Sequence, residues 1–105
     1  MFDAIKKLLG IKTTDYTQLM AQGALIIDVR TKGEFNGGHI KGSINIPVDK
    51  LSASLPKVKA KDKPIITCCA SGGRSASAKS ILKANGYSNV YNGGAWQSLN
   101  RKIQN

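Results

Sequence analysis

The sequence lacks several features that define common protein classes. It has no apolar run long enough to span a bilayer, and its first residues lack the long apolar region and cleavage site of a signal peptide. It has only two cysteines, Cys68 and Cys69, and neighbours in sequence make a poor disulfide framework because they would close almost no loop. We therefore expect reduced thiols, a cytoplasmic location and no stable membrane association.

Histidine and acidic residues are also scarce. The single histidine, His39, is far in sequence from the cysteines, so no Cys/His cluster has metal-ligand spacing and we expect no metal. Six acidic residues stand against 16 lysines and arginines, and the resulting net charge of +10 suits a small anionic ligand. The densest basic run, at 57–63, has no aromatic side chain and no arginine. We therefore interpret it as a solvated connection and expect no specific nucleic-acid partner.

The chain has 105 residues, which is the size of one domain with a real core. At its start, Phe2, Ile5, Leu8 and Leu9 share one helical face, and Gly10 ends the pattern. We predict an amphipathic helix over 1–10 and a single domain over 11–105. This helix either lies on the domain or contacts a membrane or partner, and the sequence leaves both possibilities open.

From residue 11 onward, short apolar runs alternate with helical patterns. The predicted strands are at 11–13, 24–29, 43–47, 64–68 and 90–91, and the predicted helices are at 14–22, 31–35, 48–55, 75–85 and 95–103. The alternation predicts an α/β fold with a mostly parallel sheet of about five strands and helices on both faces. Ligands of such sheets bind beyond the carboxyl ends of the strands, where Asp28, Cys69 and the predicted turn at 92–94 fall.

One stretch combines a buried strand, a glycine loop and a helix start. The apolar run ends at Cys68. The loop after it contains Gly72 and Gly73, and the helical pattern begins at Ser75. Both glycines can take positive φ, so that the loop N–H groups point inward, where the helix start also favours an anion. A thiol at this place is shifted toward thiolate. The same pattern also fits a phosphate-binding loop with a bystander cysteine, or a plain buried turn.

The two cysteines should differ in environment. Successive side chains of a strand point to opposite faces of the sheet, so Cys68 and Cys69 should lie in different environments. We expect Cys69, where the loop departs, to be the reactive thiol with the lowered pKa. We expect Cys68 to face a helix layer as a small apolar residue.

Six stretches together resemble the rhodanese homology domain in order and spacing. They are Asp28-Val29-Arg30, Glu34-Phe35, Gly38-His39-Ile40, the segment 42–47, the loop Cys69 to Ser75 and the segment 92–96. The resemblance implies the rhodanese α/β fold and a sulfurtransferase that works through a cysteine persulfide. It implies a small anionic sulfur donor such as thiosulfate, a thiol or cyanide acceptor that can be a protein thiol, and no cofactor.

The resemblance also assigns roles by position. It makes Cys69 the nucleophile and Arg74 a ligand of the anionic donor, and it makes Asp28 and Arg30 a support for the loop. The N–H cradle for the persulfide would come from Ala70, Ser71, Gly72, Gly73, Arg74 and Ser75. Family members that use thiosulfate well often carry a basic residue directly after the cysteine, and here that residue is Ala70.

Two other functions fit parts of the pattern. Counted from Cys68, the spacing to Arg74 resembles the signature of cysteine-dependent phosphatases, although Thr67 replaces their usual histidine and no general acid is identifiable. The chain could also be a non-catalytic module that binds or carries sulfur.

Overall fold

A computed structural model describes residues 14–55, 58, 61–71 and 73–104. The helix predicted at 1–10, the strand predicted at 11–13, Gly72 and much of the basic run lie outside the described residues. In the part of the chain that is described, no helix is long and apolar enough to cross a membrane.

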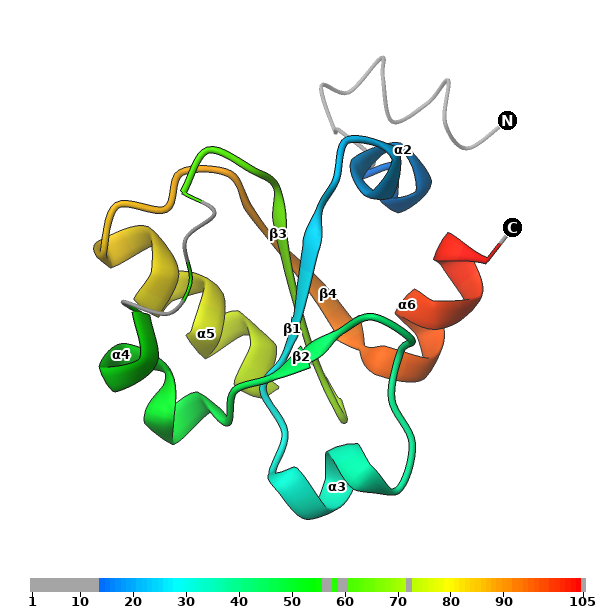
Figure 1. The fold of residues 1–105 in the computed structure, drawn as a ribbon, viewed down its shortest axis with the longest axis horizontal. Helices are drawn as coiled ribbons and strands as arrows, with labels where there is room; N and C mark the ends of the chain where they lie inside the picture. Colours follow the sequence, from blue (N-terminus) through cyan, green and yellow to red (C-terminus); the bar gives the residue numbers. More distant parts are fainter. Residues whose placement is uncertain (1–13, 56–57, 59–60, 72, 105) are drawn as a thin grey trace.

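Four strands form a parallel sheet in the order β2-β1-β3-β4 (Figure 1). They are β1 (Leu25–Asp28), β2 (Ile44–Asn45), β3 (Ile65–Cys69) and β4 (Val90–Ala95). The predicted α/β class and parallel sheet are confirmed. The sequence predicted about five strands, and the described residues contain four, because the first predicted strand falls at 11–13.

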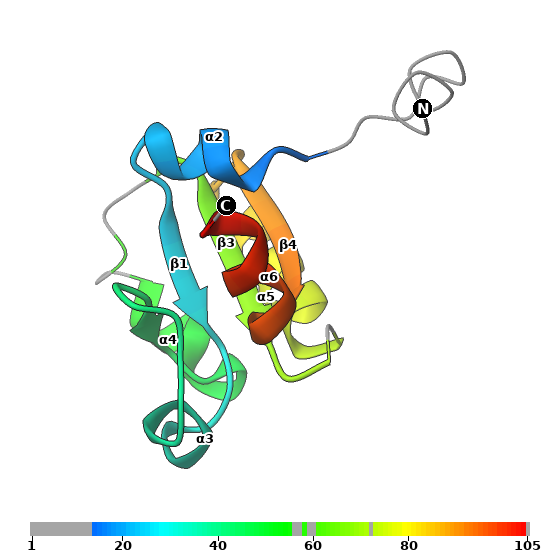
Figure 2. The ribbon, with the colours of Figure 1, turned by 90° about the vertical axis from the view of Figure 1, so that its right-hand side faces the viewer.

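Helices cover both faces of this sheet, as the alternation predicted. They are α2 (Tyr16–Ala21), α3 (Lys32–Asn36), the short 3₁₀ turn η1 (Val48–Lys50), α4 (Leu51–Ser54), α5 (Gly73–Ala84) and α6 (Trp96–Ile103). Helices α4 and α5 pack on one face, and α2 and α6 pack on the other (Figures 1 and 2). Helix α3 lies beyond the carboxyl end of β1, next to the edge where ligands bind in parallel sheets (Figure 1).

The central strand β3 is buried along its whole length, which explains its continuous apolar pattern. Ile65 and Cys69 join the core cluster beneath α4 and α5. Ile66 and Cys68 join the cluster beneath α2 and α6. The period of two along the strand therefore places the two neighbouring cysteines on opposite faces of the sheet.

The last strand is longer than the sequence predicted. We expected a strand at 90–91 and a glycine turn at 92–94, but β4 continues to Ala95, which pairs with Cys69 beyond a shift in register. Gly93 permits this, because a Cβ atom there would lie 2.8 Å from Leu99 Cδ2 and 2.9 Å from Ile66 Cγ2. The sequence pattern predicts a turn at Gly93. In the structure, Gly93 instead lets β4 lie close to Leu99 and Ile66.

The cysteine loop is shorter than predicted. Strand β3 includes Cys69, and α5 begins at Gly73, two residues before Ser75. Gly73 lies in α5, so the prediction that it belongs to the loop before the helix is wrong. Gly73, Arg74 and Ser75 instead form the first turn of α5, whose N–H groups have no partner within the helix.

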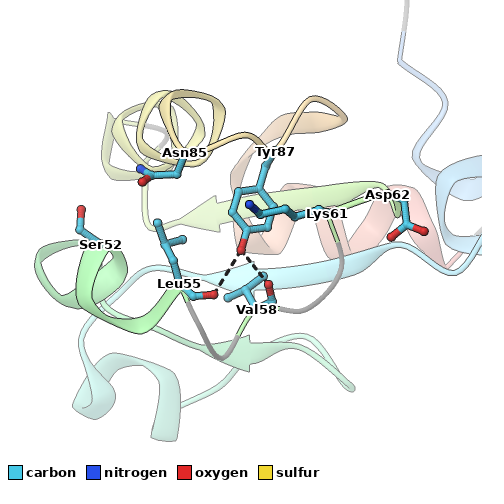
Figure 3. A pocket seen from close by; sticks show the side chains of 7 residues that line it. All are labelled: Ser52, Leu55, Val58, Lys61, Asp62, Asn85 and Tyr87. Atoms are coloured by element: carbon cyan, nitrogen blue, oxygen red, sulfur yellow. Dashed lines mark hydrogen bonds between the residues drawn. The ribbon is translucent and has the colours of Figure 1, made fainter.

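A pocket of about 620 Å³ lies at the opposite, amino end of β3 (Figure 3). It is lined by Ser52, Leu55, Val58, Lys61, Asp62, Asn85 and Tyr87. The Tyr87 hydroxyl donates to the Val58 carbonyl at 2.7 Å, and Lys61 Nζ lies 5.3 Å from the centre of the Tyr87 ring. The length of β3 separates this pocket from Cys69, and no sequence-predicted site residue lines it.

Gly93→Ala is predicted to destabilise the fold. The added methyl group cannot fit without moving Leu99, Ile66 or the β3 backbone, and such overpacking costs about 1 to 3 kcal/mol. Urea unfolding measures the loss. Gly33→Ala is the matched control, because a Cβ atom at Gly33 meets nothing within 4 Å. Equal stability of the two variants would show that β4 does not depend on this close contact.

Candidate active site

A chain of hydrogen bonds links Cys69 to the neighbouring strand. Cys69 is 0% exposed, and its Sγ donates to Ser75 Oγ at 3.3 Å. Ser75 is buried in the first turn of α5, and its hydroxyl donates to Asn92 Oδ1 at 2.6 Å. The Gly94 N–H donates to the same oxygen at 3.0 Å. The sulfur of Cys69 is therefore fixed to a polar network, although the residue is packed within the core.

The start of α5 is held against β3 by a second bond. The Thr67 hydroxyl donates to the Ser75 carbonyl at 2.9 Å. This contact keeps the amino end of the helix, with its partial positive charge, close to Cys69. Among the sequence-predicted cradle residues, Ala70 and Ser71 are exposed after β3, while Gly73, Arg74 and Ser75 form the helix start. Gly72 lies outside the described residues.

Asn92 is a site residue that the sequence analysis did not single out. We placed it in a turn at a strand end, and its amide oxygen in fact receives two donors that fix the helix start and the backbone beside it. The available signal was its position at the carboxyl end of a strand, where polar side chains of parallel sheets converge.

Cys68 lies in a different environment from Cys69. It is also 0% exposed, but it packs among Leu19, Ile26 and Leu99 on the other face of the sheet. Burial, and after it the nearby carboxylate of Asp28, raise the pKa of Cys68 to about 12. Cys68 therefore stays protonated at neutral pH and behaves as the small apolar residue that we expected. The two thiols differ in their surroundings and not in their exposure.

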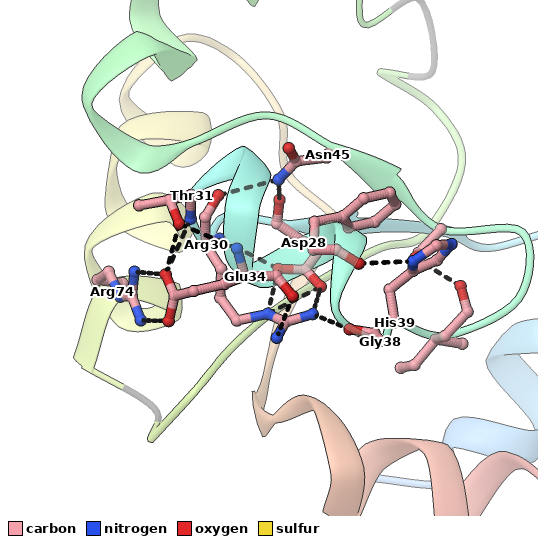
Figure 4. Close-up of polar contacts among 11 residues, drawn as sticks. Asp28, Arg30, Thr31, Glu34, Gly38, His39, Asn45 and Arg74 are labelled. Atoms are coloured by element: carbon pink, nitrogen blue, oxygen red, sulfur yellow. Dashed lines mark hydrogen bonds and ion pairs between the residues drawn. The ribbon is translucent and has the colours of Figure 1, made fainter.

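Asp28 and Arg30 form a buried ion pair at the end of β1 (Figure 4). Arg30 Nη2 lies 2.7 Å from Asp28 Oδ2, and Arg30 Nε lies 2.9 Å from Asp28 Oδ1. The side chains are 6% and 0% exposed. The hydrogen bonds that Arg30 donates to Asp28 raise the pKa of Arg30 above its ordinary value. Asp28, which stands within an apolar run, thus has the charged partner that its burial requires.

Arg30 also organises the segment that follows β1. Its Nη2 donates to the Gly38 carbonyl at 2.7 Å, and its Nη1 donates to the Glu34 carbonyl at 3.3 Å. The guanidinium lies 4.8 Å from the centre of the Trp96 ring. We expected Asp28 and Arg30 to support the cysteine loop, and the hydrogen bonds of Arg30 beyond Asp28 reach α3 and the turn after it. This segment then contacts α5 through Glu34.

Arg74 is paired with Glu34 (Figure 4). Arg74 Nη1 lies 2.7 Å from Glu34 Oε1, and Nη2 lies 3.0 Å from Oε2. Glu34 Oε1 also accepts the N–H and the hydroxyl of Thr31 at 3.0 and 3.1 Å, which completes a capping box at the start of α3. The bond from Arg74, and then those from Thr31, lower the pKa of Glu34 to about 2. The family resemblance assigned Arg74 to a donor anion, and no local sequence pattern indicates its pairing with Glu34.

His39 is held in the turn after α3. Its Nδ1 lies 2.8 Å from the Phe35 carbonyl oxygen, and the rings of His39 and Phe35 stack with their centres 3.7 Å apart. Within the described ranges, no group of three His, Cys, Asp or Glu residues could hold a metal ion.

The fold and the site together define a class of protein. It is a parallel α/β domain in which the central strand ends in a cysteine and the next helix begins beside the sulfur. Residues 12–98 match the family model of the rhodanese-like domain, and the chain therefore belongs to that family.

The chain is similar to proteins of different lengths. The uncharacterised protein YqhL of Bacillus subtilis is 41% identical over 69 residues, which cover 66% of this chain and 54% of YqhL. A rhodanese from Escherichia coli has a similar structure, with a TM-score of 0.67, 30% identity and coverage of 71% of this chain and 89% of that one. A human single-domain sulfurtransferase, TSTD1, has a TM-score of 0.62, 29% identity and coverage of 77% and 85%. The chain spans 21% of the tRNA uridine(34) hydroxylases that it also matches.

Asp28→Asn is predicted to destabilise the protein strongly. Asparagine keeps the shape of the side chain but leaves the buried Arg30 without a counter-charge, which costs about 3 to 5 kcal/mol. Asp49→Asn, at an exposed position in η1, is the matched control and should stay within about 0.5 kcal/mol of the parent. Denaturant unfolding measures the free energy of unfolding of both variants. If Asp28→Asn loses no more stability than Asp49→Asn, the prediction is wrong.

Asn92→Ala is predicted to weaken both the fold and the site. It leaves the Ser75 hydroxyl and the Gly94 N–H without this acceptor, at a cost of about 1 to 3 kcal/mol. Because Ser75 contacts Cys69, the rate at which Cys69 reacts with iodoacetamide should also change. Asn85→Ala, at an exposed position directly after α5, is the control. If both variants match the parent in stability and in Cys69 reactivity, the network does not position the cysteine.

Proposed function

We propose that the protein is a sulfurtransferase that carries sulfane sulfur on Cys69 as a persulfide. The observation that supports this proposal is the position of Cys69, at the carboxyl end of β3, with its sulfur 3.3 Å from Ser75 Oγ in the first turn of α5. That place favours a negative sulfur atom, because the N–H groups of the helix start and the helix dipole point toward it. The similarity to a rhodanese and to a sulfurtransferase agrees with this chemistry.

The reaction consists of two displacements at sulfur. The Cys69 thiolate attacks the outer sulfur of a donor such as thiosulfate, the sulfur–sulfur bond of the donor breaks, and sulfite leaves with the bonding electrons. A thiolate or cyanide acceptor, which can belong to a protein, then attacks the outer sulfur of the persulfide. The Cys69 thiolate leaves and is regenerated. Both steps balance without an oxidant or reductant, and we assign no metal or organic cofactor to either.

The first turn of α5 stabilises the charged sulfur in this proposal. The N–H groups of Gly73, Arg74 and Ser75 are donors from a helix start, and preorganised donors of this kind stabilise developing charge. The Ser75 hydroxyl accepts from the Cys69 thiol and donates to Asn92, so it would stabilise the thiolate only after turning its proton from Asn92 to the sulfur. Since Cys69 is 0% exposed, we expect reagents to reach it through local opening. Cys68 and Cys69 are equally buried, so the difference between the two thiols lies in the groups that surround each sulfur.

The phosphatase alternative requires Cys68 as the nucleophile. Cys68 packs on the opposite face of the sheet from α5, and its pKa is raised to about 12. A thiol with that pKa is almost entirely protonated at neutral pH and is a poor nucleophile. These observations favour sulfur transfer through Cys69.

Cysteine variants test the proposal. Cys69→Ser should lose thiosulfate-to-cyanide sulfur transfer, because a hydroxyl cannot hold a persulfide. Cys68→Ser should keep most activity and lose about 1 to 3 kcal/mol of stability to a buried hydroxyl. Mass spectrometry after exposure to thiosulfate should show one added sulfur atom on the peptide that contains Cys69, at Cys69 in the parent and in Cys68→Ser.

A phosphatase assay on the parent and the same variants tests the alternative function. The parent should not hydrolyse p-nitrophenyl phosphate. If Cys68→Ser is the inactive variant and the parent hydrolyses the phosphate ester, the nucleophile is Cys68 and the proposed sulfurtransferase is wrong.

A further inference from the structure

Four charged side chains near the proposed site form two ion pairs. Asp28 pairs with Arg30, and Glu34 pairs with Arg74. Each pair has zero net charge, so neither pair offers a free positive charge to an anion, although the whole chain carries +10. Ala70, the residue after the nucleophile, is exposed and uncharged.

Glu34 is held firmly where an anionic donor would need to bind Arg74. Its two carboxylate oxygens take both Nη atoms of Arg74, at 2.7 and 3.0 Å. From the other side, the N–H and hydroxyl of Thr31 hold the same carboxylate. The side chains of Glu34 and Arg74 are each 37% exposed, so the pair lies at the surface, within reach of a ligand. A bidentate pair of this kind is specific in geometry and stronger than a single contact.

The Glu34–Arg74 pair therefore hinders the binding of a dianionic donor such as thiosulfate at this surface. To bind Arg74 the donor must displace Glu34, and a displaced carboxylate would stay nearby and repel it. An alkyl persulfide, R–S–SH, is neutral at its sulfur atoms and carries at most one negative charge there when ionised. It needs no free guanidinium, and the N–H groups at the start of α5 can accept it.

We propose that Glu34 is a specificity-determining residue that occupies Arg74 and so selects alkyl persulfides over thiosulfate as the sulfur donor. This inference rests on the proposed persulfide chemistry of Cys69. In the loading step, the Cys69 thiolate attacks the outer sulfur of R–S–SH, and the bond between the two donor sulfurs breaks. The thiolate R–S⁻ leaves, and Cys69 carries the S–SH group.

The test compares two donors on the purified protein. Thiosulfate and 2-mercaptoethanol persulfide are supplied separately, and timed mass spectra measure the gain of one sulfur atom on Cys69. We expect the parent to load faster from the alkyl persulfide. A short neutral peptide that carries a cysteine persulfide is run in parallel. Faster loading from the peptide assigns a polypeptide donor, faster loading from 2-mercaptoethanol persulfide assigns a small thiol, and both support the persulfide class.

Glu34→Gln is the decisive variant. Glutamine still accepts hydrogen bonds from Thr31, so α3 keeps its cap while Arg74 loses its charged partner. The ratio of the two loading rates should shift toward thiosulfate by about tenfold, the effect of one charge-assisted contact. Adding Arg74→Gln to this variant should remove the gain. Thr31→Ala removes the hydroxyl contact to Glu34 and leaves the ion pair, so its donor ratio should shift less than that of Glu34→Gln.

Each result bears on one of the two proposals. An unchanged donor ratio in folded Glu34→Gln, or a parent that loads faster from thiosulfate, overturns the role of Glu34 and leaves the persulfide chemistry standing. If no donor adds sulfur to Cys69 of the parent, the proposed function itself fails, and the inference about Glu34 fails with it.

Discussion

The buried ion pair between Asp28 and Arg30 is the contact on which this end of the molecule depends. Burial of either charge alone would be costly, so the two must meet in one fixed geometry. That geometry directs the remaining donors of Arg30 to the carbonyls of Glu34 and Gly38 and places its guanidinium over Trp96. Helix α3 is therefore held near the carboxyl edge of the sheet. From there the side chain of Glu34 reaches Arg74 at the start of α5.

Two identical side chains have different surroundings because successive side chains of a strand point to opposite faces of the sheet. Cys68 and Cys69 are adjacent and equally buried, yet one faces apolar side chains and a carboxylate and the other faces a helix start. A buried thiol without stabilising donors stays protonated. Donors at a helix start favour the thiolate. Within this short sequence, a one-residue difference in position therefore separates a structural thiol from a candidate nucleophile.

Charge acts on two length scales in this protein. The excess of lysine and arginine gives a field that attracts anions to the whole surface, and salt screens it beyond about 8 Å at physiological ionic strength. At the site itself, the pairs Asp28–Arg30 and Glu34–Arg74 cancel their own charges. General attraction to anions and selection of a donor are thus separate properties. Only the second depends on the geometry of particular residues.

The sequence by itself determined the features that depend on local pattern. Alternating apolar runs and helical patterns are enough for a parallel α/β sheet, the period of two separates Cys68 from Cys69, and an aspartate within an apolar run needs a partner such as Arg30. The tertiary structure alone decided which distant groups meet. Ser75 contacts Asn92 across 17 positions, and Arg74 contacts Glu34 across 40. The packing of α5 and α3 against the sheet sets both contacts, as the packing of Leu99 and Ile66 makes Gly93 part of a strand and not of a turn. Such contacts carry no local signal, because they depend on how separate elements are placed relative to one another.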